Sequence, residues 1–331
     1  MIGERRRARL AGVLLGSTLL AGGVVTAQEV AVPGSPASAD AERASFAAFL
    51  TQVRTEAATR GISAATIEQA FDGLDPLPIV VERDRSQPET VLTIDQYVRR
   101  RLTKGFVATA REMRRTHREL LAKVSARYGL PADYIVAIWG MESNFGRFTG
   151  VRPVVQTLAT LAWEGRRAAF FTSELFDALR IVDAGHIELA SMKGSWAGAM
   201  GQTQFMPSSY LVHAQDFDED GRRDIWSSLP DVFASIANYM RAYGWSAEST
   251  WGREVRLPPG SRDRLVSQIG LRERGCRAAR DLTKPVPLAE WQALGVRTMS
   301  GRSLPKAARP ASLLRASGHT YLVYPNYDAL L

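Results

Sequence analysis

One glutamate stands where a general acid can work. Glu142 lies in the run Gly140–Gly146 (GMESNFG), directly after an apolar stretch, so its carboxylate comes at a helix end between apolar side chains such as Trp139 and Phe145. Desolvation favours the neutral form of a carboxyl group, and a carboxyl that is neutral near pH 7 can protonate a glycosidic oxygen. The alternative is a structural glutamate paired with a neighbour such as Arg147.

A second run, from Gly194 to Tyr210 (GSWAGAMGQTQFMPSSY), combines small, polar and aromatic residues. Small residues let the backbone approach a ligand closely, polar groups can bind hydroxyls, and rings can pack on the apolar faces of sugars. The polar candidates are Ser195, Gln202, Gln204 and Tyr210, and the aromatic candidates are Trp196 and Phe205. Alone, the run also fits a tight structural crossover. Together with Glu142 it indicates a carbohydrate site.

The third group of candidate functional residues is an acidic run, Asp216–Asp224 (DFDEDGRRD). It has acids at positions 1, 3, 5 and 9 and glycine at position 6, which matches the start of an EF-hand calcium loop. The twelfth position is Ser227 and not the bidentate glutamate, so the match is partial. A calcium site that stiffens the following helix entrance and a solvated acidic turn both fit this run.

The composition excludes several classes of protein. The chain has 331 residues, of which 45% are hydrophobic and 23% charged, so it has room for two domains and is too apolar for a disordered protein. Its single cysteine, Cys276, cannot form an internal disulfide. The four histidines are scattered and form no pairs with zinc-ligand spacing, so no zinc site is expected.

The first 27 residues are predicted to be a cleavable signal peptide. Arginines precede an apolar run from Leu10 to Val25, and small residues follow as far as Ala27. A single-span anchor is the alternative, and no cysteine follows the run to accept a lipid. This segment carries four arginines and one glutamate, so the remainder keeps +5 of the total charge of +8. That excess suits an anionic polymer of the cell wall or a membrane surface better than nucleic acid, and simple solubility explains it equally well.

The remaining pattern predicts a mainly helical α+β protein. Residues 28–40 are predicted to be a flexible leader, 41–245 a helical domain, and 246–331 a small strand-containing lobe packed on it. Within the helical domain a long basic helical stretch is expected over about 89–127, ended by Gly129-Leu130-Pro131. Other helices are expected at 132–140, 154–161, 166–184, 207–214 and 229–243, and the short runs 254–257, 291–296 and 321–324 suggest strands.

The two glycine-rich motifs and Phe233–Tyr239 (FASIANY) resemble lytic murein transglycosylases of the membrane-bound B type, from about Phe46 to Leu331. The resemblance implies a goose-lysozyme-like catalytic domain, a periplasmic location, and cleavage of peptidoglycan between N-acetylmuramic acid and N-acetylglucosamine. It also implies that family members continue past Leu331 with a Tyr-Asn pair and a final helix, where this sequence stops.

The resemblance also implies roles for individual residues. Glu142 matches the single catalytic acid/base, and Ser195 matches a serine that contacts the reacting sugar. The other implied substrate-binding residues are Gln204, Phe205, Tyr239, Arg166, Arg167 and, as a weaker match, Tyr97. The implied calcium site comprises Asp216, Asp218, Asp220, Arg222 and Asp231.

One carboxylate suffices if the substrate assists. Glycosidases that hydrolyse their substrate ordinarily use two carboxylates. No second carboxylate accompanies Glu142 in either cleft motif, because Glu164 and Asp216 lie outside them. This favours intramolecular closure to a 1,6-anhydromuramoyl product, with no cofactor required for the chemistry. The alternatives are a hydrolytic muramidase and a noncatalytic peptidoglycan-binding scaffold. We further expect a monomer whose partners are glycan strands and proteins of cell-wall synthesis, with no nucleic acid.

Overall fold

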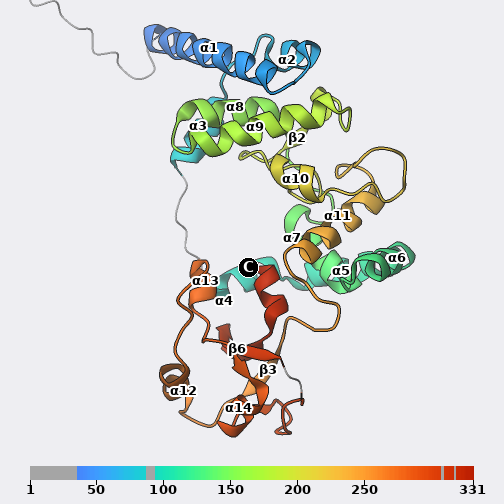
Figure 1. Ribbon diagram of the computed structural model, residues 1–331, viewed down its shortest axis with the longest axis vertical. Coiled ribbons are helices and arrows are strands. Elements are labelled where there is room, and N and C mark those ends of the chain that lie inside the picture. Colours follow the sequence, from blue (N-terminus) through green and yellow to red (C-terminus); the bar gives the residue numbers. More distant parts are fainter. Residues whose placement is uncertain (1–35, 87–93, 307–308, 317) are drawn as a thin grey trace, which may run out of the picture. The chain divides into compact units, whose positions relative to one another are not determined.

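The computed structural model describes residues 36–86, 94–306, 309–316 and 318–331 (Figure 1). The chain divides into two compact units, 1–42 and 43–331, and all the sites discussed below lie in the second. The signal peptide predicted over 1–27 lies outside the described residues. Helix α1 begins at Pro36, inside the segment predicted to be a flexible leader, because proline suits a first helical turn and the alanines that follow favour helix.

The fold class is confirmed, since helices dominate the described chain and its main sheet lies in the C-terminal part. One hydrophobic cluster packs three helices from the start of the described chain against three from its middle, around buried Phe46, Phe171 and Phe176. These helices are α1 (Pro36–Thr59), α2 (Ala64–Phe71), α3 (Pro78–Arg85), α8 (Val154–Glu164), α9 (Ala168–Asp183) and α10 (Pro207–His213). Helices α8, α9 and α10 match the helices expected at 154–161, 166–184 and 207–214, because each carries buried residues at helical spacing.

A second cluster surrounds the helix that ends at Glu142. It packs α5 (Lys104–Thr116), α6 (Arg118–Tyr128), α7 (Ala132–Ser143) and α11 (Leu229–Ala242) around Trp139 and Phe233. With α4 (Ile94–Arg101), the helices α5 and α6 replace the single basic stretch expected over 89–127. The chain breaks at Thr103, whose hydroxyl caps α5 by accepting from the Phe106 N–H, and at His117, whose ring lies against Trp139 and Phe233.

Gly129 ends α6 in the left-handed conformation, with φ of 75°, as its sequence position predicted. The following residues Leu130 and Pro131 turn the chain into α7, which therefore starts in the apolar cluster and carries Glu142 to its last turn. The C-terminal part of the second motif leads in the same way through α10 to the loop before α11.

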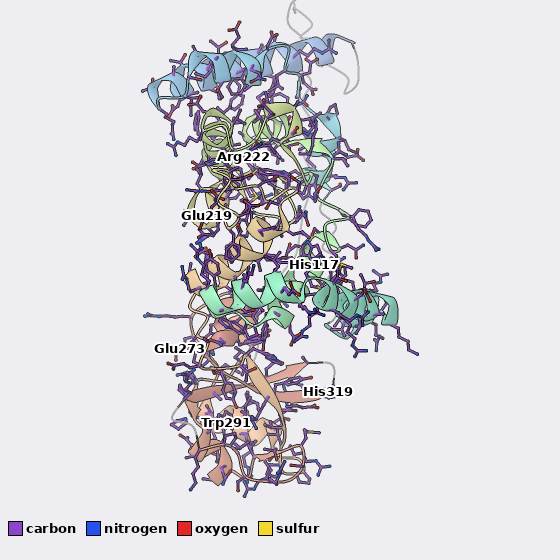
Figure 2. The ribbon with its side chains drawn as sticks, turned by 90° about the vertical axis from the view of Figure 1, so that its right-hand side faces the viewer. His117, Glu219, Arg222, Glu273, Trp291 and His319 are labelled. Carbon is purple, nitrogen blue, oxygen red and sulfur yellow. The ribbon has the colours of Figure 1, made fainter. Side chains whose placement is uncertain are left out.

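The C-terminal part of the chain holds a five-stranded antiparallel sheet in the order β4-β6-β7-β3-β5. Its strands are β3 (Gly252–Arg256), β4 (Val286–Pro287), β5 (Arg297–Thr298), β6 (Pro310–Ala316) and β7 (His319–Val323). Strands expected near 254 and 321 are confirmed. The run 291–296 forms no strand: its first half ends helix α14 (Leu288–Ala293), in which Leu288 and Trp291 lie one turn apart and are both buried against the sheet (Trp291 is labelled in Figure 2).

Short elements complete the described chain. They are the paired strands β1 (Arg152–Pro153) and β2 (Lys193–Gly194), the helices α12 (Arg262–Ile269) and α13 (Arg277–Arg280), and the 3₁₀ helices η1 (Leu189–Ser191) and η2 (Pro325–Leu330). Within the described ranges, no helix is long and apolar enough to cross a membrane.

Candidate active site

Glu142 lies on the wall of a pocket of about 480 Å³. Residues from four parts of the chain form this pocket: the end of α7, the second glycine-rich motif, helix α11 and the C-terminal segment. They are Ile138, Glu142, Thr203, Gln204, Phe205, Met206, Ser209, Ile236, Tyr239, Met240, Tyr243, Asp328, Ala329, Leu330 and Leu331. The pocket therefore brings together Glu142, Gln204, Phe205 and Tyr239, four of the residues that the sequence predicted.

The backbone after Glu142 turns sharply. Asn144 and Phe145 both have left-handed backbone conformations, with φ of 49° and 60°, which non-glycine residues adopt at a cost. The turn folds the Phe145 ring back against α7, where a Cβ on Gly140 would lie only 2.6 Å from the ring. Ser143 stabilises the turn, since its hydroxyl donates to the Trp139 carbonyl and accepts from the Gly146 N–H. The GMESNFG motif thus ends α7 at the point where Glu142 reaches the pocket.

Burial raises the pKa of the Glu142 carboxyl above its ordinary value, and the positive charge of Arg101 opposes this shift. The side chain touches the solvent that fills the pocket, while the surrounding protein still removes much of the water that would stabilise the charged form. Within the described part of the chain Glu142 forms no ion pair, so the pairing with Arg147 considered from the sequence is not made. Arg101 instead donates a hydrogen bond to the Met141 carbonyl.

Aromatic side chains form another part of the pocket lining. Phe205 and Tyr239 have ring centroids 5.2 Å apart, and Tyr239 stacks on Tyr243 at 4.5 Å with an interplanar angle of 28°. Burial first, and then Tyr243 and the charge of Glu142, raise the pKa of Tyr239 to about 12. Its hydroxyl therefore stays protonated at all physiological pH values. Tyr243 was not predicted from the sequence, although its position four residues after Tyr239 on the same helix would have indicated it.

Some residues of the second glycine-rich motif line the pocket, and others are buried in the protein that supports it. Gln204 has φ of 52° and donates from its amide to the Gly201 and Thr149 carbonyls. Gln202, considered as a ligand-binding residue, is instead buried, because its amide accepts from Trp139 Nε1 at 2.7 Å and donates to the Trp226 carbonyl. Tyr210 is also buried, and its hydroxyl donates to the Arg223 carbonyl. These two polar groups hold the motif in place and are not available to a ligand.

Four of the substrate-binding residues that the family resemblance implied are not among those that line the Glu142 pocket. The Ser195 hydroxyl accepts from the backbone N–H groups of Ala197 and Ala199. Arg166 and Arg167 both form ion pairs with Asp84, whose side chain is 2% exposed, at 3.3 and 3.1 Å. Tyr97 is exposed on α4.

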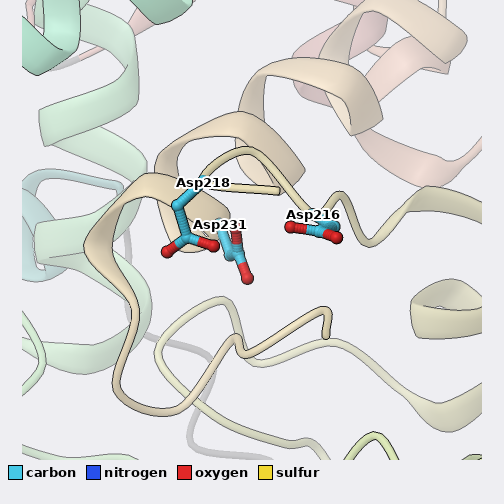
Figure 3. A group of neighbouring side chains, drawn as sticks. All are labelled: Asp216, Asp218 and Asp231. Carbon is cyan, nitrogen blue, oxygen red and sulfur yellow. The ribbon is translucent and has the colours of Figure 1, made fainter. Parts of the chain in front are cut away.

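The acidic run brings three carboxylates together. One oxygen from each of Asp216, Asp218 and Asp231 lies within 4.8 Å of the others, with Asp216 and Asp218 on the loop and Asp231 in the first turn of α11 (Figure 3). Asp220 is not part of this group, and its carboxylate accepts from the Arg222 N–H. Burial, together with the charges of Asp218 and Asp216, raises the pKa of Asp231 to about 6. Clustered carboxylate oxygens are the donors that calcium prefers.

Comparison with known proteins identifies the family. Residues 45–331 match the transglycosylase SLT domain. The chain belongs to this family. The resemblance to lytic murein transglycosylases of the B type that the motifs indicated is thereby confirmed.

Over 172 residues the chain is 38% identical to membrane-bound lytic murein transglycosylase B of Escherichia coli (strain K12), a match that covers 50% of this chain and 45% of that relative. The matched region is therefore less than half the length of that protein.

Two solved structures of the same type resemble this SLT-domain protein. SltB3 from Pseudomonas aeruginosa, in complex with NAG-anhNAM-pentapeptide, has a TM-score of 0.79 and 43% identity, covering 86% of this chain and 74% of that one. The lytic transglycosylase Slt35 of Escherichia coli, in complex with calcium, has a TM-score of 0.67 and 26% identity, covering 87% and 86%.

The electrostatics of the pocket predict how Glu142 titrates. Because burial raises its pKa and the charge of Arg101 lowers it, the Arg101→Gln substitution should raise the pKa of Glu142 further. The fraction of Glu142 that can act as an acid, which falls as pH rises through this pKa, should then persist to higher pH. NMR titration of the ¹³C-labelled glutamate carboxyls measures both values.

Arg147→Gln is the matched control, because Arg147 is exposed and does not contribute to the shift. It should leave the titration of Glu142 unchanged. A pKa for Glu142 at or below that of an exposed glutamate would show that the pocket does not desolvate this carboxyl.

Proposed function

We propose that this protein is a lytic transglycosylase that cleaves the β-1,4 bond between N-acetylmuramic acid and N-acetylglucosamine in peptidoglycan and forms a 1,6-anhydromuramoyl end. The observation that carries the proposal is the Glu142 carboxyl on the wall of a pocket lined by aromatic rings: the residue is exposed to solvent, partial burial of its carboxyl raises its pKa, and it forms no ion pair within the described chain. Family membership and the resemblance to SltB3, which was solved with a NAG-anhNAM-pentapeptide, support the substrate class.

The reaction needs only one acid/base. Protonated Glu142 donates its proton to the glycosidic oxygen as the bond from that oxygen to C1 of the muramoyl residue breaks. The muramoyl N-acetyl group stabilises the positive charge that develops at C1. The Glu142 carboxylate then removes the proton of the C6 hydroxyl, whose oxygen forms the new bond to C1. Glu142 ends in its starting state, and intramolecular attack can lower the barrier by up to about 7–11 kcal/mol.

The other groups of the pocket hold the sugar chain. Tyr239 and Tyr243 offer ring faces to the C–H faces of pyranose rings, and the protonated Tyr239 hydroxyl can donate to a sugar oxygen. Phe205 is buried and supports Tyr239 from within the pocket wall. Ser195, Tyr97 and the Arg166–Arg167 pair, which lie outside the pocket lining, are proposed to contact the muropeptide farther along the strand. The carboxylate of Asp84 holds both arginines in a fixed position for this contact.

Asp328 is the observation that favours the runner-up, a hydrolytic muramidase. It is the other carboxylate that lines the pocket, and a hydrolase could use it to activate water. Its Oδ1, however, lies 2.6 Å from Arg272 Nη1 in an ion pair. The guanidinium competes for this carboxylate, which favours the route with a single acid/base.

We also propose that calcium binds between the acidic loop and α11. Asp216, Asp218 and Asp231 would hold the ion, and the acidic-loop residues Asp220 and Arg222 complete the set that the resemblance implied. Burial is the main cause of the raised pKa of Asp231, and the charges of Asp218 and Asp216 add to it; a divalent cation would relieve this repulsion, so the donor set fits. The ion would stiffen the loop before α11, which carries Tyr239. The calcium complex of Slt35 supports this proposal.

A periplasmic location with export by the 1–27 segment is proposed from the sequence and from the cell-wall enzymes to which the chain is similar. Peptidoglycan strands are the proposed partner. Binding to proteins of cell-wall synthesis and the monomeric state remain predictions.

Replacing Glu142 tests the catalytic assignment. The Glu142→Gln protein should fold and bind glycan but lose about 10²-fold or more of its turnover of purified sacculi, because the amide cannot transfer the proton. Soluble muropeptides released with time measure the loss. Glu119→Gln, at a glutamate whose side chain is 82% exposed on α6, is the matched control and should retain full turnover. If the Glu142→Gln protein kept most of its activity, another group would be the acid.

The product separates the two routes. A lytic transglycosylase leaves a 1,6-anhydro end, whereas a muramidase leaves a reducing muramic acid that is heavier by one water. Mass spectrometry of the released muropeptides should show the anhydro form alone. In the Asp328→Asn protein the product should stay the same, since Asp328 does not activate water. Reducing ends that vanish in this variant would instead establish hydrolysis through Asp328.

Calcium should raise the thermal stability of the protein. A ligand that binds only the folded state at 100 times its dissociation constant adds about 2.7 kcal/mol. We expect Tm measured by scanning calorimetry to rise with calcium and to fall back with a chelator. Asp218→Asn should remove this response, while Asp263→Asn, at a side chain that is 93% exposed, should not. An unchanged Tm, with no heat of calcium binding in titration calorimetry, would refute the site.

A further inference from the structure

A second pocket, of about 530 Å³, lies in the C-terminal part of the chain. It is formed by the loop after α12, the segment before β4, the first residue of β6, the end of β7 and the start of η2. The residues that line it are Arg272, Glu273, Arg274, Lys284, Pro285, Pro310, Val323, Tyr324, Pro325 and Asp328. Glu273 is labelled in Figure 2, on the same part of the chain as Trp291. Neither the sequence analysis nor the proposed mechanism assigns this pocket a role.

The pocket carries three cations and two carboxylates, so its lining has a net positive charge. Arg272 is paired with Asp328, and Lys284 Nζ lies 2.6 Å from Glu273. Arg274 forms no ion pair with any residue that the structure describes. In addition, Arg272 Nε is buried without a hydrogen-bond partner in the described chain. The exposed Arg274 guanidinium, which has no carboxylate partner among the residues described, can bind the carboxylate of a ligand or another anion.

The rest of the lining suits a peptide. Three prolines and the Tyr324 ring give the pocket rigid apolar walls. Tyr324 is itself held in place, because its hydroxyl accepts from Arg253 Nε at 3.0 Å and its N–H donates to the Trp251 carbonyl. A short peptide with small apolar side chains and free carboxylates matches apolar walls with cations at the rim, whereas a neutral sugar chain would leave the Arg274 guanidinium without an anionic partner.

The position of this pocket favours the stem peptide of peptidoglycan as its ligand. Asp328 lines both this pocket and the pocket of Glu142, so the two are neighbours across η2. A muramoyl residue carries its peptide as a branch that leaves the glycan sideways. A stem of five residues reaches at most about 17 Å when extended, which is ample for two adjacent pockets.

We propose that the Arg272–Arg274–Lys284 pocket binds the carboxylate-bearing stem peptide of the muramoyl residue whose glycan lies in the Glu142 pocket. This inference rests on the proposed function for its substrate class. In this arrangement residues 325–331 lie between the two ligand parts, with the glycan in the Glu142 pocket and the peptide in the Arg272–Arg274–Lys284 pocket. Peptide-bearing strands are therefore bound more tightly than bare glycan.

The test compares two tetrasaccharides, one that carries pentapeptides and one without peptides, by titration calorimetry. Both are titrated into the Glu142→Gln protein, so that no turnover occurs. The variant adds Arg274→Glu and Lys284→Glu, at side chains that are exposed or half-exposed. Reversing both charges should weaken binding of the peptide-bearing glycan about tenfold or more, as expected for the loss of charge-assisted hydrogen bonds. Binding of the bare glycan should change less than twofold.

Arg264→Glu, an exposed arginine on α12 outside the pocket lining, is the matched control and should affect neither ligand. The alanine pair Arg274→Ala and Lys284→Ala provides a second variant if the reversed charges disturb folding. Equal weakening of both ligands, or no weakening of either, overturns the inference. Turnover of purified, peptide-bearing sacculi by the unmodified protein tests the proposed function separately. If no turnover occurs while the stem-dependent binding persists, the function fails and the peptide pocket stands.

Discussion

The site depends on one carboxyl group that is desolvated and left without a cation to neutralise it. Although Glu142 is exposed, partial burial of its carboxyl raises the free energy of the charged form and so shifts the balance toward the neutral form that can donate a proton. Arg101 is near enough to lower the pKa of Glu142, but its hydrogen bond to the Met141 carbonyl directs the guanidinium to the backbone. The pocket thus avoids the ion pair that would make Glu142 a structural residue.

Maintaining that arrangement requires a strained turn and a rigid support. Non-glycine residues in the left-handed region cluster beside the pocket, at Asn144, Phe145 and Gln204. Such conformations persist only where the surrounding contacts over-determine them. Here the amide of Gln202 provides one such contact, since it links Trp139 of the first motif to the Trp226 carbonyl. The two motifs, which are about 60 residues apart in the sequence, therefore act as one unit.

The C-terminal segment completes the pocket and connects it to the sheet. Residues 328–331 form part of its lining, while the ion pair between Asp328 and Arg272 ties the same segment to the part of the chain before β4. The segment is further anchored by Asn326, which is buried and exchanges hydrogen bonds with the backbone of Ser246. The strand-containing part of the chain is thus involved in shaping the site as well as in stability.

Local chemistry in the sequence determined much of this protein. The capping residue Ser63, the helix end at Gly129, the apolar periodicity of α9 and α11, and the acid at the end of α7 are set by residues a few positions apart, where the physical rules are local. The family, too, was evident from short motifs.

Only the tertiary structure decided which polar residues face the pocket. Gln202 and Gln204 are two positions apart and chemically identical, yet one is buried between two tryptophans and the other lines the site. Tyr243 and Asp328 join the pocket because packing between distant segments brings them there, whereas the Asp220 carboxylate is held outside the acidic cluster by the nearby Arg222 N–H. Residue type and local spacing determine the chemistry that a side chain can perform, whereas long-range packing determines which groups that side chain contacts.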